Sequence, residues 1–258
     1  EKYGRHASNL GAVIACNFGK KHGKPSFIFD PICVDELDPV ARISGHPLFE
    51  RRSIFHALNQ KKAARIIAER LNSSYQDLTL VVAHLGGGIT VGLHKHGRVV
   101  DVNNGTEGEG PFTPERSGGM ELGSFLKYIF DNDLDFEQAF RIVMGEGGLA
   151  AYFGTVDFKE LMKRYKEGGD KKVRVVIEAM AYQVSQEIAA RSILACGDID
   201  GIIFTGGLSH SETFVDLIRE KVKHLAKNIF VIPGEKELEA LAEGVVLLLE
   251  GKIEALEY

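Results

Sequence analysis

The sequence is poor in features that would tie it to a membrane or to an oxidising compartment. It has only three cysteines, Cys16, Cys33 and Cys196, with no C-x-x-C pair and none beside a histidine at zinc spacing. Three buried, reduced thiols are therefore expected rather than a disulfide framework or a zinc site. No apolar run approaches the roughly 20 residues that cross a bilayer, and no basic stretch followed by an apolar one, as in a secretory leader, is visible at the start. We therefore expect a cytoplasmic protein without a membrane partner.

Excess positive charge is also missing. The chain has 31 Lys and Arg against 36 Asp and Glu, a net charge of −5, which argues against a nucleic-acid partner or a polybasic membrane module. Its 258 residues suffice for one large domain or two small ones with an ordinary hydrophobic core. Glycine, in contrast, is abundant: 29 residues, of which 11 lie between Gly86 and Gly123. The backbone of this segment is therefore expected to adopt an unusual conformation.

Apolar patterns alternate between strands and helices along the chain. Strands are expected at 25–31, within 79–103, within 200–207 and at 228–234, and helices at 8–23, 56–74, 121–131, 135–145, 157–167, 170–196, 211–226 and 235–251, with a loop from Cys33 to Glu50. The stretch 79–103 contains three strands joined by a glycine turn and a hairpin corner, at which His94 and His96 are expected to be exposed and not to bind metal. The alternation predicts an α/β fold whose largely parallel central sheet is made mixed by this hairpin and is flanked by helices.

Two glycine turns follow buried strands. HLGGGIT follows the strand LTLVVA, and FTGGLSH follows the strand DGIIF. Three consecutive glycines leave their amides unshielded, so that they can form a nest for an anion, and the second turn leads to a helix whose N-terminus could face a phosphate. Ligands of α/β folds bind at the carboxyl ends of strands. A nucleotide site and a pair of plain tight turns both account for the pattern, and neither turn is a P-loop.

Several polar side chains stand near these turns or at other strand ends. Arg116 follows the proline-bounded loop 103–114 and suits planar recognition of a phosphate or carboxylate, a solvated surface arginine being the alternative. His84 lies between a buried strand and the glycine turn, where its side chain would face a phosphate. Asp30 follows an expected strand and suits Mg²⁺. His56 begins a helix, either with a chemical role or as a plain N-terminal residue.

These segments resemble the acetate/butyrate kinase family, and within it the butyrate kinase branch. The stretch HLGGGITVGLHKHGRVVDVNNGTEGEGPFTPERSGGME resembles the family's second phosphate motif and following loop. FHALNQK resembles the segment FHGTSHK, which puts the family's first histidine at His56 and Gln60 where the second would be. HASNL and IFDP resemble HNPPN and FDTAF, which puts His6 and Asp30 on active-site positions. The resemblance implies that Arg116, His56, His6 and Asp30 are catalytic.

The resemblance also implies ATP and Mg²⁺ as cofactors. TVDFKE resembles the adenosine-site segment SSDFRD, and FTGGLSH resembles TAGIGEN. The implied nucleotide-binding residues are His84, Leu85, Gly86, Gly87, Gly88, Asp157, Phe158, Lys159, Gly206, Gly207, Leu208, Ser209 and His210. IPGEKELEALAEG resembles a segment in which a glutamate helps to hold Mg²⁺. Lys236 aligns with that glutamate, so the implied metal ligands are Asp30 and the neighbouring Glu235 and Glu237.

The implied reaction is phosphorylation of butyrate by ATP to butyryl phosphate and ADP. A kinase for another short acid (acetate, propionate or isobutyrate) and a non-catalytic nucleotide-binding module are the alternatives. Chaperone and actin relatives carry D-x-G-G-G-T, with aspartate where this chain has His84, which favours the acyl kinase.

The implied architecture is the actin-like ATPase (ribonuclease H-like) fold with two α/β domains. Residues 1–32, joined by the C-terminal helix 233–258, are expected to belong to the first domain and residues 33–232 to the second, nucleotide-binding domain. The family's opening phosphate loop, N-P-G-S-T-S-T-K, and an initiator methionine are not in this sequence. We therefore expect the C-terminal two-thirds of a family member, inactive by itself. Family members usually assemble, so a homo-oligomer is also expected.

Overall fold

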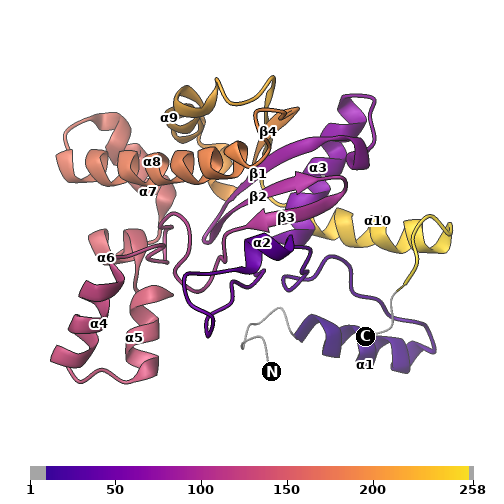
Figure 1. The fold of residues 1–258 in the computed structure, drawn as a ribbon, viewed down its shortest axis with the longest axis horizontal. Coiled ribbons are helices and arrows are strands. Elements are labelled where there is room, and N and C mark those ends of the chain that lie inside the picture. The colour runs from indigo at the N-terminus through magenta and orange to yellow at the C-terminus, as the bar shows by residue number, and fades with distance from the viewer. Residues whose placement is uncertain (1–9, 256–258) are drawn as a thin grey trace.

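The computed structural model describes residues 10–255, which form a five-stranded mixed sheet with helices on both faces (Figure 1). The strand order is β3-β2-β1-β4-β5, with β1 (Thr79–Leu85), β2 (Ile89–Lys95), β3 (Arg98–Val102), β4 (Gly201–Gly206) and β5 (Ile229–Pro233). The helices are α1 (Leu10–His22), α2 (Pro39–Arg42), α3 (Ala57–Arg70), α4 (Leu122–Asp131), α5 (Phe136–Val143), α6 (Gly148–Phe153), α7 (Phe158–Glu167), α8 (Lys171–Ile193), α9 (Glu212–Val222) and α10 (Glu237–Leu249).

The sheet combines three antiparallel strands with two strands that are added in parallel. β1, β2 and β3 are antiparallel neighbours, whereas β4 runs parallel to β1 and β5 parallel to β4. The predicted mixed α/β sheet is therefore confirmed. Because parallel strands end at one edge, the turn after β1, the turn after β4 and the end of β5 lie at the same edge of the sheet.

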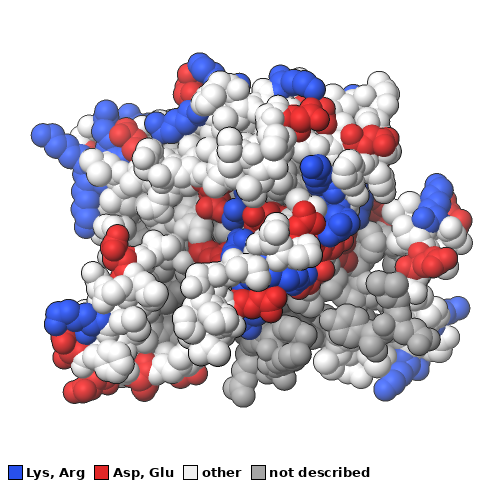
Figure 2. All heavy atoms as spheres, in the orientation of Figure 1, with Lys and Arg blue, Asp and Glu red and all other residues white. Residues whose placement is uncertain are grey.

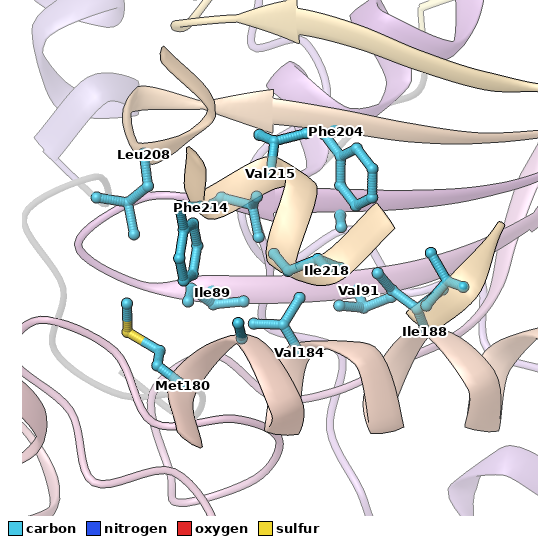
Figure 3. Close-up of a cluster of buried hydrophobic side chains, with 14 of the residues drawn as sticks. Ile89, Val91, Met180, Val184, Ile188, Phe204, Leu208, Phe214, Val215 and Ile218 are labelled. Carbon is cyan, nitrogen blue, oxygen red and sulfur yellow. The ribbon is translucent and has the colours of Figure 1, made fainter. Parts of the chain in front are cut away.

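The main core lies between the sheet and helices α8 and α9 (Figure 3). Alternate residues of β1 face this side, among them Val81 and Ala83, while Leu80 and Val82 face helix α3 on the other side. Both faces of β1 are thus buried, which explains why its sequence is a continuous apolar run rather than an alternating one. Successive side chains of a strand point to opposite faces, so each side chain of β1 packs against the helices on one face of the sheet or on the other.

Helix α3 covers the second face of the sheet and contacts β1, β4 and α10. Its small residues Ala64 and Ala68 and the larger Ile67 face the sheet and are buried. Helix α10 lies beyond α3 at one end of the molecule (Figure 1), where Gly244 lets it approach the ring of Phe29. A Cβ at Gly244 would lie 2.5 Å from Phe29 Cγ, so the close approach requires glycine there.

Two expectations from the sequence are wrong. Residues 25–31 belong to none of the five strands, Asp30 within them has φ 42°, and Phe27 and Ile28 are 41% and 48% exposed. An apolar run indicates that a segment can be buried, but it does not show whether another segment lies alongside to form the backbone hydrogen bonds of a sheet. The cysteines are not all buried, since Cys16 and Cys196 are exposed and Cys33 is half-buried.

The surface carries both signs of charge. On the face shown in Figure 2, blue and red side chains are interspersed rather than gathered into one basic or acidic field. Within residues 10–255 no helix combines the length and the apolar character needed to cross a membrane.

Helix α8 offers a matched test of this core. Val184 is fully buried against the sheet and α9, whereas Val175 on the same helix is 65% exposed. Val184→Ala should lower the free energy of unfolding by about 2 kcal/mol, because two buried methyl groups are lost and a cavity remains. Val175→Ala should change it by less than about 0.5 kcal/mol. Urea titration followed by circular dichroism measures both, and equal losses would contradict the packing described.

Candidate active site

The two glycine turns predicted from the sequence meet at the edge of the sheet. Gly206, at the end of β4, has φ 85° and ψ 172°, and a Cβ there would lie 2.5 Å from the carbonyl oxygen of Leu85 at the end of β1. The amides of Gly206 and Gly234 each donate to the other's carbonyl over 3.0 Å. The ends of β1, β4 and β5 are thereby held together at one point.

The turn Gly86–Gly88 is held in shape by two hydrogen bonds. The amide of Gly86 donates to the carbonyl of Gly88 over 3.1 Å. The hydroxyl of Thr113 donates to the carbonyl of Gly87 over 2.6 Å and accepts from the amide of Arg116 over 3.0 Å. Thr113 therefore links the glycine turn to the loop that carries Arg116.

The guanidinium of Arg116 lies directly against this turn. A Cβ at Gly88 would overlap Arg116 Nη1 and lie 3.2 Å from His56 Cε1, so only glycine leaves room for both side chains. Arg116 Nη1 donates to the carbonyl of Gly105, and Nη2 lies 3.7 Å from a carboxylate oxygen of Glu115. Burial lowers the pKa of Arg116, yet an arginine remains charged at neutral pH. Its Nε is buried without a hydrogen-bond partner in the described part of the chain.

Two histidine rings stack beside the arginine. The centroids of His56 and His84 are 3.7 Å apart, with 7° between the ring planes. His84 is buried, and burial, His56 and Arg116, in that order, hold its pKa well below the usual value, so its ring is neutral. Its Nδ1 lies 2.9 Å from Asn59 Oδ1. Its Nε2 has no hydrogen-bond partner among residues 10–255 and lies 3.7 Å from a carboxylate oxygen of Glu235.

A cleft of about 770 Å³ adjoins the second glycine turn, a size that suits a small ligand. It is lined by Phe158, Lys159, Met162, Lys163, Lys166, Glu167, Gly207, Leu208, His210 and Ser211. Five of the predicted adenosine-site residues therefore line one cleft. Asp157 instead caps α7, accepting from the amide of Glu160 over 3.0 Å, and Ser209 Oγ donates to the carbonyl of Gly206. His6 lies outside the described residues.

The carboxylates predicted to hold Mg²⁺ differ in their surroundings. Asp30 accepts from Arg65 over 2.9 Å and lies 3.3 Å from Lys61 Nζ, so its charge is already matched by two cations. Burial and then Glu235 raise the pKa of Glu237, and Glu235 lies 3.7 Å from His84 Nε2 beside the glycine turn. No cluster of three or more His, Cys, Asp and Glu residues suited to a metal occurs in the part of the chain that is described. One or two carboxylates with substrate phosphates are the usual Mg²⁺ environment, and Glu235 with Glu237 fits it better than Asp30.

Several polar residues that shape this region were not predicted from the sequence. Thr90 and Gln60 bond to each other beside His56, Asn59 contacts His84, and Thr113 holds the glycine turn. The only signal for Gln60 was its place where the resembling family has a histidine. The expected exposure of His94 is wrong: it is fully buried beneath α3, because this helix covers that face of the hairpin.

The acetokinase family matches residues 45–243, more than half of the sequence. The chain belongs to the acetokinase family. It is similar in fold to an acetate kinase of Porphyromonas gingivalis, with a TM-score of 0.74 and 18% identity over 86% of this chain and 63% of that one. It is also similar to a propionate kinase from Francisella tularensis subsp. tularensis SCHU S4 (TM-score 0.71, 19% identity, 81% and 60% covered) and to the acetate kinase of Entamoeba histolytica (0.71, 16%, 83% and 64%).

These findings confirm the predicted α/β fold of the actin-like type and, at the level of the family, the resemblance seen in the sequence. The acetokinase chain described here spans less than two thirds of the length of each of the three solved kinases. The butyrate branch, the division into domains and the roles of the site residues stay predictions.

The meeting of strand ends can be tested at two adjacent glycines. Gly206→Ala should lower the free energy of unfolding by about 1–3 kcal/mol, because its backbone conformation is almost confined to glycine and its Cβ would press on Leu85. Gly207→Ala, whose Cβ would have no heavy atom within 4 Å, should change it by less than about 0.5 kcal/mol. Equal stability of the two variants in urea titrations would show that the strand ends are not packed this way.

Proposed function

We propose that this chain is the nucleotide-binding part of an acyl kinase that transfers the γ-phosphoryl group of ATP to a short-chain fatty acid, with butyrate as the preferred acceptor. The observation that carries the proposal is the convergence of Arg116, His56 and His84 on the Gly86–Gly88 turn. A buried donor there, the Nε–H of Arg116, has no hydrogen-bond partner within residues 10–255. Buried polar atoms need partners, and a phosphate oxygen can accept from this N–H.

The chemistry of the acceptor matches this set of groups. A carboxylate is already ionised at neutral pH, since carboxyl pKa values lie well below 7. One of its oxygens attacks the γ-phosphorus, the bond from that phosphorus to the β,γ-bridging oxygen breaks, and ADP leaves. No general base is required, so a neutral, buried His84 is no obstacle. The obstacle is repulsion between an anion and a triphosphate, which fixed positive charge and oriented amides reduce.

The residues then divide by position. The amides of Gly86–Gly88 and the ring of His84 hold the ATP phosphates, while the cleft beside Gly207 and Phe158 holds adenosine. Arg116 and His56 contact the transferring phosphoryl group from the other side of the turn.

Mg²⁺ would be held by Glu235 and Glu237 and would neutralise charge on the β- and γ-phosphate oxygens when bound. Asp30 does not fit as a direct ligand, because Lys61 and Arg65 occupy its carboxylate. It instead ties residues 25–31 to α3. Residues 1–32 and 233–258 are assigned to the first domain of the whole kinase and residues 33–232 to the second, and the whole kinase to a cytoplasmic homo-oligomer.

Other short acids are the competing acceptors, because two of the solved structures of similar fold are acetate kinases and one is a propionate kinase. Butyrate is favoured by the sequences of the glycine turn, HLGGG, and of the loop before Arg116, both of which resemble the butyrate kinase branch.

Arg116 provides the test of the mechanism. In the full-length enzyme, Arg116→Ala should lower the turnover number at least about a hundredfold, the usual loss when one preorganised charge donor is removed. The measurement is trapping of the acyl phosphate with hydroxylamine. Arg141→Ala is the control, because Arg141 lies on α5, is exposed and pairs with the exposed Glu146. Turnover of Arg116→Ala within tenfold of the parent enzyme would remove Arg116 from the mechanism.

Acceptor preference needs a separate measurement. With the same assay, kcat/KM should be highest for butyrate and lower for acetate by at least about tenfold, since each methylene that fills an apolar pocket contributes roughly 10–200-fold. Propionate and isobutyrate complete the panel. A maximum at acetate or propionate would keep the acyl kinase but assign it to another acid.

A further inference from the structure

Behind His56 lies a buried layer of polar side chains between α3 and β2. The hydrogen-bonded pairs are Tyr75 Oη with His94 Nδ1 (2.7 Å), His94 Nε2 with Gln60 Oε1 (3.0 Å), Gln60 Nε2 with Thr90 Oγ1 (2.8 Å) and Thr90 Oγ1 with His56 Nδ1 (2.9 Å). Tyr75, His94, Gln60 and Thr90 are all buried. A continuous row of hydrogen bonds therefore ends on one ring nitrogen of His56.

The side-chain amide of Gln60 determines which atom donates and which accepts in each hydrogen bond of this row. Its Nε2 lies 3.0 Å from the backbone carbonyl of Thr90, which can only accept, so the amide nitrogen must face β2. Gln60 Oε1 then faces His94 Nε2 and accepts a hydrogen bond from its N–H. Burial, Lys61 and Arg65, in that order, lower the pKa of His94 to about 3, so its ring carries a single N–H at neutral pH. That proton is on Nε2, and Nδ1 accepts from the hydroxyl of Tyr75.

The hydroxyl of Thr90 determines the role of His56 Nδ1. Its oxygen accepts a hydrogen bond from the second N–H of Gln60 Nε2. The hydroxyl therefore donates its own proton to His56 Nδ1, the remaining partner at hydrogen-bond distance. A hydroxyl has one proton to donate. His56 Nδ1 is therefore an acceptor, and the ring proton of neutral His56 lies on Nε2.

The periodicity of the two elements builds this layer. Thr90, Gly92 and His94 alternate along β2 and so share the face toward α3. His56 and Gln60 are four residues apart at the start of α3, and the backbone N–H of Gln60 donates to the backbone carbonyl of His56 over 2.9 Å. Their side chains therefore lie on the same side of the helix. A Cβ at Gly92 would lie 2.6 Å from Gln60 Oε1, so glycine between Thr90 and His94 makes room for the amide.

We propose that Tyr75, His94, Gln60 and Thr90 are positioning residues that hold His56 as the Nε2–H tautomer, so that it presents a hydrogen-bond donor to the transferring phosphoryl group. The role toward the phosphoryl group rests on the proposed function; the tautomer itself does not. A wrong tautomer would present a lone pair to a phosphate oxygen, and tautomer errors at catalytic histidines are costly. Gln60 suits this task because, unlike a histidine in its place, an amide holds a donor and an acceptor in fixed positions without titrating.

The test is the protonation state of each ring nitrogen, read from long-range ¹H–¹⁵N spectra of the full chain labelled with ¹⁵N-histidine at neutral pH. His56 should show a protonated Nε2 and an unprotonated Nδ1, and His94 the same pattern. Thr90→Val removes the donor to Nδ1 at nearly constant volume and should shift His56 toward the Nδ1–H form. Thr90→Ser keeps the hydroxyl and should restore the parent spectrum. A parent His56 that carries its proton on Nδ1 would overturn the proposal, as would an unchanged tautomer in Thr90→Val.

Kinetics separate this proposal from the proposed function. In the full-length enzyme, Thr90→Val should lower kcat by about 10–100-fold, the usual loss for a residue that orients another, with little change in KM for the acid. His96→Asn, at the exposed hairpin tip with φ 53°, is the control and should leave the His56 and His94 signals and kcat unchanged. If the tautomer is as stated but no acyl phosphate forms with the parent enzyme, the kinase proposal fails and the row of hydrogen bonds stands. If turnover is normal in Thr90→Val, the positioning role fails and the kinase proposal stands.

Discussion

Arg116 can lie against the turn between β1 and β2 only because residue 88 has no side chain. The same missing Cβ admits the ring of His56, which arrives from the start of α3. A guanidinium that is 13% exposed and a stacked pair of imidazole rings, of which His84 is buried and His56 half-buried, are thus brought to one patch of bare backbone. The arrangement is costly for a protein without a ligand, since the buried Nε–H of Arg116 is left without a partner among the described residues. An anionic ligand at this turn would accept from that N–H and remove the cost, which is why the arrangement supports phosphate binding.

The site is assembled from segments that are distant in sequence but end at one edge of the sheet. β1, β4 and β5 are parallel, so their carboxyl ends meet, and each contributes a glycine or a turn. The phosphate-facing turn follows β1, and the adenosine cleft lies beside the turn that follows β4. Close contact between Gly206 and Leu85 makes these two regions neighbours without any further element between them.

Much of the fold could be predicted from the sequence because it follows from local patterns. Continuous apolar runs located β1 and β4, and glycine at the strand ends located the two turns. The failures concern partners supplied by distant segments. Residues 25–31 have the pattern of a strand but no neighbouring strand among the described residues, and His94 lies on the face of the hairpin that α3 covers. The contacts of Thr113 with Gly87 and of Asn59 with His84 join residues about two dozen positions apart, which no local pattern reveals.

The prediction of Asp30 as a metal ligand illustrates the same limit. A carboxylate after an apolar run is a reasonable metal ligand by position, but its availability depends on the cations nearby. Lys61 and Arg65 lie one turn apart on α3 and both face Asp30. The family resemblance gave the position of the aspartate and could not give its neighbours.

The stacked pair of histidines has a mechanical consequence. Two nearly parallel rings 3.7 Å apart leave no room between them for another atom. A ligand that pushes His84 toward His56 would therefore push His56 as well. In the proposed kinase both rings lie against phosphate groups, so a shift of the phosphates at His84 would also move the ring beside the transferring phosphoryl group.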